Sequence, residues 1–266
     1  MPLLKLADTC RLYYQFYDSA KTKPVVVFLN GTTQTTKSWG VQAKDLQDHF
    51  RILLYDARGQ GQSDLGVNDL TIDGHVDDLI QLLDYLDVDS SHLVGLSHGA
   101  RVACELGRIY PERTDKMILC GLGNDLGPRT SAILESWYQI LKSSNLETLV
   151  WAMLPVVFGD PFLEKHKTIL NDMVAAIVKR NRPEAVEMHL RSMAQYLSVP
   201  DILTENYHPT LIVTGKQDVI IQMDQTRMLA KKLGAHLIQL KGVGHSPNIE
   251  APEAFNKVIA QFLLAD

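Results

Sequence analysis

The chain has 266 residues, of which 45% are hydrophobic and 21% charged, and its formal net charge is −5. This composition excludes a disordered or fibrous chain and is typical of a globular protein with a sizeable core, arranged as one large domain or two small ones. The small acidic excess excludes attraction to nucleic acid or to an anionic membrane by net charge.

The N-terminal segment and the longest apolar run indicate where in the cell the protein is expected. Lys5, Asp8 and Arg11 interrupt the start of the chain before any apolar stretch is long enough for a signal peptide. The run from Leu149 to Gly159 contains Pro155 and is too short to cross a bilayer. We expect a soluble, cytoplasmic protein with no membrane span.

The three cysteines, Cys10, Cys104 and Cys120, show neither a CxxC motif nor a Cys/His spacing typical of zinc. We therefore expect each to be a small buried side chain, with no disulfide framework, no metal site and no cofactor.

Short apolar runs alternate with longer amphipathic ones along most of the chain. Strands are predicted over 10–17, 24–29, 51–55, 92–96, 117–122, 210–214 and 235–240, and helices over 71–87, 98–109, 224–233 and 252–264. Runs such as VVVFL are apolar throughout, as in parallel strands that are covered on both faces. The alternation predicts an α/β sheet with helices on both faces.

Residues 124–208 break this alternation, because they show helical periodicity without a convincing strand. Four helices are predicted there, over 131–144, 146–159, 161–180 and 183–197, with Pro155, Pro161 and Pro183 punctuating them. We interpret 124–208 as a helical insertion in a single domain whose core is 1–123 and 209–266.

The sequence Gly95-Leu96-Ser97-His98-Gly99 is the strongest chemical signal. It lies between a predicted strand and a predicted helix, the context of a nucleophile elbow. A serine on such a turn projects its hydroxyl beyond the sheet edge, and the N–H of His98 at the helix N-terminus can bind an oxyanion. We predict Ser97 as the nucleophile, without a role for the His98 side chain.

A serine nucleophile needs a general base that an acid orients. His245 lies in a glycine-rich turn after the last predicted strand, whereas histidines on predicted helices, including His75 and His189, are expected to be structural. Asp218 follows the strand 210–214 and is the favoured acid, with Asp125, after the strand 117–122, as the alternative.

A second oxyanion donor is expected in the loop after the strand 24–29. The sequence there begins Asn30-Gly31-Thr32, and the backbone N–H of Thr32 is the candidate donor. The glycine-rich stretch 56–64 lacks the GK[ST] of a phosphate loop, so we interpret it as a turn that braces the neighbouring active-site loop.

Taken together, these motifs resemble the α/β-hydrolase family, in the branch of esterases, enol-lactonases and cofactor-free haloperoxidases. The resemblance covers nearly the whole chain and is carried by NG…W (30–39), DxRGxGxS (56–63), GLSHG (95–99), YPER (110–113), GxxD (215–218) and GHSPNIEAPEAF (244–255). It implies a mostly parallel eight-stranded sheet with a helical cap inserted after the sixth strand. The chain order of Ser97, Asp218 and His245 is the order used by that fold.

Two departures refine the resemblance. Epoxide hydrolases and haloalkane dehalogenases of this fold carry Asp where this chain has Ser97, so both activities are disfavoured. Relatives mostly have His-Gly where this chain has Asn30-Gly31, and the family histidine helps to brace the oxyanion loop. The Asn-Gly and Thr-rich stretch is also similar to the acyltransferase that joins hydroxyacyl chains in rhamnolipid synthesis.

The expected function is a serine hydrolase of carboxylic esters with small to medium acyl groups, acting on a small-molecule ester, lactone or thioester. Transfer of an acyl group to an alcohol, lactone hydrolysis and a non-catalytic binding module are the alternatives. A lactonase acting on a carboxylate would need a cation in the pocket, for which the candidates are Arg101, Arg129 and Lys37. Side chains expected to form either the pocket lining or the core of the insertion are Trp137, Tyr138, Trp151, Met153, Leu154, Phe158, Phe162, Met188 and Met193.

Overall fold

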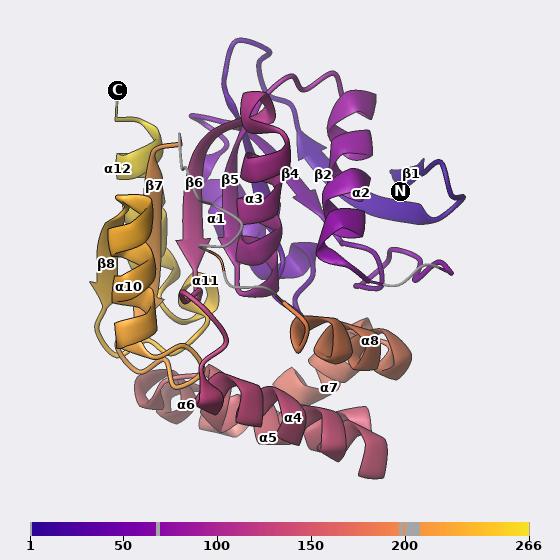
Figure 1. Ribbon diagram of the computed structural model, residues 1–266, viewed down its shortest axis with the longest axis vertical. Coiled ribbons are helices and arrows are strands. Elements are labelled where there is room, and N and C mark those ends of the chain that lie inside the picture. Colours follow the sequence, from indigo (N-terminus) through magenta and orange to yellow (C-terminus); the bar gives the residue numbers. More distant parts are fainter. Residues whose placement is uncertain (1, 68–69, 197–198, 200–207, 266) are drawn as a thin grey trace.

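An eight-stranded sheet forms the centre of the molecule (Figure 1). The computed structural model describes residues 2–67, 70–196, 199 and 208–265. The strands are β1 (Leu3–Lys5), β2 (Arg11–Tyr17), β3 (Val25–Leu29), β4 (Arg51–Tyr55), β5 (Ser91–Leu96), β6 (Thr114–Cys120), β7 (Thr210–Gly215) and β8 (His236–Leu240). Their order in the sheet is β1-β2-β4-β3-β5-β6-β7-β8, and only the β1–β2 and β2–β4 pairs of this sheet are antiparallel.

All seven strands predicted from apolar runs are present, so the alternating α/β pattern is confirmed. The prediction over 117–122 needs correction, because β6 begins at Thr114 and ends at Cys120. Gly121 has a φ of 57°, in the left-handed region that glycine tolerates, and this ends the strand. The pattern missed β1, whose three residues are too few to show a period.

Helices cover both faces of the sheet, as predicted. The helices α2 (Ile72–Tyr85), α3 (His98–Ile109) and α10 (Met223–Leu233) pack on one face, and α1 (Gly40–Leu46) and α12 (Pro252–Leu263) on the other. Strand β3 shows why its sequence is apolar throughout: Val25, Val27 and Leu29 face the first layer, whereas Val26 and Phe28 face the second. Helix α1 was not predicted, because seven residues give little periodicity.

A second group of helices follows β6 and lies over the carboxyl ends of the parallel strands (Figure 1). We call these helices the cap: α4 (Pro128–Ser143), α5 (Leu146–Val157), α6 (Asp160–His166), α7 (Leu170–Arg180) and α8 (Pro183–Met193). Side chains of α4, α5, α7 and α8 share an apolar core of their own, which also includes Ile220 and Ile221 after β7. The cap lies within the predicted insertion, of which 197–198 and 200–207 fall outside the described residues.

The cap helices differ from the predicted four in two places. The predicted helix 161–180 is divided into α6 and α7 by a 3₁₀ turn over Lys167–Ile169. Pro155 was expected to punctuate the chain but lies inside α5, which continues to Val157. Pro155 cannot donate the helical hydrogen bond to the carbonyl of Trp151, and α5 ends two residues after it.

The expectations about cysteines and membrane spans can also be compared with the structure. Cys10, Cys104 and Cys120 are free and buried, as predicted. No helix within the described ranges is long and apolar enough to cross a membrane.

Candidate active site

Ser97 lies on the sharp turn between β5 and α3, with backbone angles of φ 53° and ψ −113°. Its N–H donates to the carbonyl of Cys120 on the neighbouring strand at 2.8 Å. The flanking glycines make this turn possible, because a Cβ on Gly95 would lie 2.5 Å from the carbonyl oxygen of Gly99. A Cβ on Gly99 would lie 2.3 Å from the carbonyl oxygen of Leu29. The turn has the strained geometry of a nucleophile elbow.

The structure pairs His245 with Asp218. Nδ1 of His245 lies 2.8 Å from Oδ2 of Asp218, and the two side chains are 7% and 1% exposed. The other carboxylate oxygen, Oδ1 of Asp218, accepts the backbone N–H groups of Ile220 and Ile221 at 2.9 and 3.0 Å. The acid is therefore held by the loop after β7, and Nε2 of His245 is left for another partner.

The charge of Asp218 determines how His245 titrates. Burial favours the neutral imidazole, but the attraction of the Asp218 carboxylate and its hydrogen bond outweigh burial, with a smaller contribution from Glu250. The pKa of His245 is therefore raised above its ordinary value of 6.5. By favouring the protonated imidazole, Asp218 makes His245 a stronger base, which suits it to general base catalysis.

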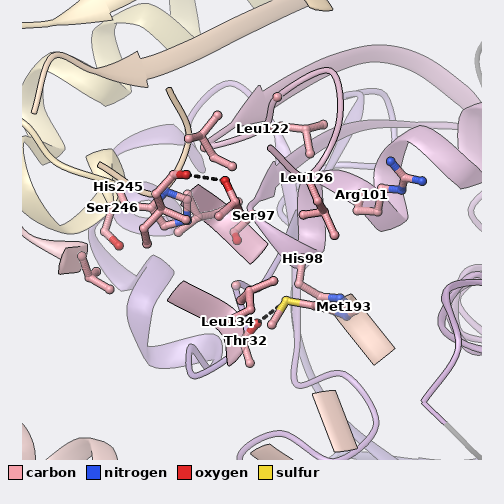
Figure 2. A pocket seen from close by; sticks show the side chains of 18 of the residues that line it. Thr32, Ser97, His98, Arg101, Leu122, Leu126, Leu134, Met193, His245 and Ser246 are labelled. Atoms are coloured by element: carbon pink, nitrogen blue, oxygen red, sulfur yellow. Dashed lines mark hydrogen bonds between the residues drawn. The ribbon is translucent and has the colours of Figure 1, made fainter. Parts of the chain in front are cut away.

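One pocket brings the predicted site residues together (Figure 2). Ser97, His245, Thr32 and His98 all line this pocket, which is partly open to solvent. Asp125, the alternative acid, lines the same pocket, but its carboxylate accepts a hydrogen bond from the side chain of Asn124.

The loop that carries Thr32 is held from three sides. Asn30 donates from Nδ2 to the carbonyl of Tyr55 at 2.9 Å and accepts from the indole N–H of Trp39 at 2.9 Å. Gln60 is fully buried and donates to the carbonyl of Gly31 at 2.9 Å and to that of Thr32 at 3.3 Å. Asn30 therefore braces the loop in place of the family histidine.

The stretch 56–64 is the bracing turn that the sequence predicted. It contains Gln60, and Asp56 accepts the backbone N–H groups of Thr36 and Gln62 at 2.7 and 2.9 Å. A Cβ on Gly61 would lie 2.1 Å from the Asp56 carboxylate, so the turn depends on that glycine.

Known proteins resemble this chain over most of its length. Residues 24–252 match the alpha/beta hydrolase fold family. The chain belongs to that family. Its expected fold, with a mostly parallel eight-stranded sheet, is thereby confirmed.

Individual relatives are distant in sequence but extend over nearly the whole chain. The chain is 25% identical to RutD, a provisionally named carbamate hydrolase from Caulobacter sp. (strain K31), with 95% of each chain covered. It is 23% identical to 3-oxoadipate enol-lactonase 2 from Acinetobacter baylyi, with 97% of each covered. The crystal structure of the enol-lactonase from Burkholderia xenovorans LB400 superposes with a TM-score of 0.89 at 24% identity, covering 99% of this chain and 100% of that one.

Glu250 supports the histidine loop of this alpha/beta hydrolase and was missed from the sequence. Its carboxylate accepts the backbone N–H groups of Gly159, Gly244 and Ser246 at 2.7, 2.8 and 3.0 Å. Burial raises the pKa of Glu250, although these three hydrogen bonds oppose the increase. The signal available was an acid five residues after His245, at the end of the short helix α11 (Pro247–Glu250).

Some of the apolar side chains expected in the insertion line a pocket, and others are buried in the core of the cap. Trp137, Met153 and Met193 line the pocket with Ser97, while Leu154 and Phe158 line a second cavity that adjoins it. Of the remaining members, Tyr138 lines a separate pocket, Phe162 is buried in the cap core, Trp151 is 39% exposed and Met188 is half-buried.

Two histidines that were expected to be structural lie in one cluster with His98. His75 and His189 are buried on α2 and α8, and their rings contact that of His98. Because the three residues come from distant segments, their spacing in the sequence gave no metal motif.

Because the turn at Ser97 is closely packed, one added methyl group is predicted to lower both stability and activity. In Gly99→Ala the new Cβ would overlap backbone atoms of β3, which cannot move aside as a flexible side chain could. We expect a fall in Tm of more than about 5 °C together with a loss of hydrolase activity.

The matched control for this prediction is Gly40→Ala. Gly40 is the first residue of α1, has a helical φ of −60°, and has no atom within 4 Å of the position of a Cβ. We expect its Tm to stay the same or to rise slightly, because alanine favours helix. Equal changes in Tm for the two variants, measured by calorimetry, would contradict the steric argument.

Proposed function

We propose that this alpha/beta hydrolase cleaves carboxylic esters through an acyl-enzyme formed on Ser97. The observation that carries the proposal is the Asp218–His245 pair, 2.8 Å apart, which shares one pocket with a serine on a strained elbow. A nucleophile, a base and an acid in this order and arrangement are suited to acyl transfer.

In the proposed reaction each group has its own step. With Nδ1 of His245 facing Asp218, its Nε2 takes the proton of the Ser97 hydroxyl as that oxygen attacks the ester carbonyl. The N–H groups of Thr32 and His98 bind the oxyanion. The protonated His245 then gives its proton to the leaving alcohol, and water releases the acyl group by the same steps.

The pocket lining points to an uncharged acyl chain of small to medium size. Leu134, Trp137, Met153 and Met193 provide an apolar surface around Ser97. The adjoining cavity shares Thr33, Gln34, Met153, Val157 and Ser246 with this pocket and extends along α5 and α7. Methionine adapts to different shapes, which favours a range of acyl groups over a single one.

Lactone hydrolysis is the second candidate, and the position of Arg101 favours it. Of the three cations considered from the sequence, Arg101 lines the pocket of Ser97, Lys37 lines only the adjoining cavity and Arg129 is exposed on α4. In Figure 2 Ser97 lies between His245 and Arg101. A carboxylate on the substrate could thus pair with a guanidinium, and two relatives are named enol-lactonases.

The nucleophile assignment predicts covalent labelling. A fluorophosphonate probe should add one adduct per chain on Ser97, located by peptide mass spectrometry. In Ser97→Ala we expect no adduct and a loss of about 10⁶-fold in kcat, the scale seen for a serine protease nucleophile. Full esterase activity in Ser97→Ala would disprove the acyl-enzyme.

The raised pKa of His245 predicts the acid limb of the pH profile. The base acts only when it is neutral, so kcat/KM should fall as the pH decreases through a value above 6.5. In Asp218→Asn the attraction is removed and burial remains, so this pKa should decrease and kcat should fall by about 10⁴-fold.

Two measurements check this prediction. The wild-type profile is measured with a nitrophenyl ester, and NMR titration follows the His245 ring in the slow variant. A wild-type limiting pKa below 6.5, or an unchanged pKa in Asp218→Asn, would contradict the assignment.

The lactonase candidate predicts a change of selectivity in Arg101→Met. The ratio of kcat/KM for a lactone that carries a carboxylate to that for a neutral ester should fall about tenfold or more, because a charge-assisted hydrogen bond is lost. Arg129→Met is the control, since Arg129 is exposed on α4, and should leave the ratio unchanged. The same ratio in both variants would reject recognition by Arg101.

A further inference from the structure

Three buried histidines lie together beside the pocket, and their side chains have no part in the proposed reaction. His75 is on α2, His98 begins α3 and His189 is on the cap helix α8, and they are 2%, 2% and 1% exposed. One ring nitrogen from each lies within 4.8 Å of the other two. The cluster therefore joins the cap to two helices of the core.

Each ring of this cluster has a nitrogen that lacks a hydrogen-bond partner. Nε2 of His75 and Nε2 of His98 have no partner in the part of the chain that the structure describes, and the ring of His189 has no hydrogen-bond partner there besides the backbone of Arg58. The rings themselves are in contact, with His75 stacked on His189 at 5.4 Å and both meeting His98 edge-on at 4.7 and 4.9 Å. Buried polar atoms without partners are unusual in proteins and call for a ligand or another explanation.

The protonation states are those that a metal ion requires. Burial lowers the pKa of His75 and of His98 well below 6.5 and that of His189 to about 4, so all three imidazoles are neutral near pH 7. Neutral imidazole is the form that binds a metal. Oη of Tyr196 lies 2.6 Å from Nδ1 of His98. When Nδ1 carries the proton and donates to Tyr196, the lone pair of Nε2 is on the opposite side of the ring and can bind a metal. Metal-binding histidines commonly donate their other ring N–H in this way.

The surrounding charges do not oppose a cation. Arg58 is near enough to lower the pKa of His75, but it is held by Asp78 at 2.7 Å and Asp8 at 2.7 Å. Arg58, Asp78 and Asp8 together carry a net charge of about −1 when all three side chains are ionised. Asp78 lies one turn beyond His75 on α2, so negative charge is close to the cluster.

We propose that His75, His98 and His189 form a binding site for one divalent transition metal ion, Zn²⁺ in particular. Imidazole ligands suit zinc, and three of them with a water molecule complete its usual tetrahedral coordination. Nitrogens in such a site are about 3.3 Å apart, so each ring has to move by about 1 Å or less from its place here.

The position of the site indicates what the metal does. His98 offers its side chain to the cluster, while its residue also lines the pocket beside Ser97. The metal would hold α8 against α2 and α3 and fix the turn that carries the backbone N–H of His98. This role is structural and does not depend on the reaction at Ser97.

The test uses the full chain without a histidine tag, stripped by a chelator and titrated with Co²⁺ and then Zn²⁺. We expect one metal ion per chain by elemental analysis and the strong visible bands of tetrahedral Co²⁺, which Zn²⁺ should abolish. At zinc concentrations about 100 times the dissociation constant, Tm should rise by about 5 °C.

Two aromatic substitutions and one control complete the test. His189→Phe and His75→Phe keep a buried ring, and each should lose the cobalt bands and the zinc-dependent rise in Tm. His236→Asn alters an exposed histidine on β8 and should keep both. Less than one equivalent bound to the wild type, an octahedral cobalt spectrum, or an unchanged response in either folded Phe variant would overturn the proposal.

Discussion

The crossing of α3 over the end of β3 is the contact on which the site depends. At Gly99 the helix passes so close to β3 that a single methyl group would meet backbone atoms of Leu29 at 2.3 and 2.5 Å. This closeness forces the chain to turn within one residue, so Ser97 adopts a positive φ at a cost of about 1–3 kcal/mol. This strained conformation directs the serine hydroxyl beyond the sheet edge, where the loops that follow four other strands come together.

The loop of the proposed base depends on the cap as well as on the sheet. The N–H of His245 donates to the carbonyl of Val157 at 2.7 Å, at the end of α5. Glu250 joins the same two segments, because its carboxylate accepts N–H groups of both Gly159 and Gly244. Displacement of α5 would break several hydrogen bonds of the histidine loop. The end of the cap helix α5 and the residue proposed to activate the nucleophile are therefore joined directly by hydrogen bonds.

Sequence patterns predicted those parts of the fold that repeat or follow a motif. Strands β3, β4 and β7 are continuous apolar runs, and the placing of Ser97 between a strand and a helix gave the position of the elbow. Elements without a period were missed, among them β1 and α1, and the start of β6 was misjudged because Asp115 and Lys116 interrupt its apolar run.

Contacts between segments that lie far apart in the sequence could not be predicted from it. Asp125 and Asp218 both follow a strand, and only the folded chain shows that the carboxylate of Asp218 meets His245. The support of the oxyanion loop by Gln60 and the histidine cluster on α2, α3 and α8 join residues whose spacing carries no pattern. Such sites arise from tertiary packing alone.

Hydrogen bonds also determine the position of α8 on the core. Asn181, just before α8, donates to the carbonyl of Thr33 at 3.1 Å, and Arg182 donates to that of Ser63 at 2.6 Å. Apolar packing alone would tolerate sliding of one helix over another, whereas hydrogen bonds fail when their atoms move by about 1 Å. The cap is thus tied at α5 to the histidine loop and at α8 to the loops near Thr32. Since both attachments border the pocket, polar contacts hold its sides in place, while the apolar side chains of its lining, which we propose receive the acyl group, make few directional contacts.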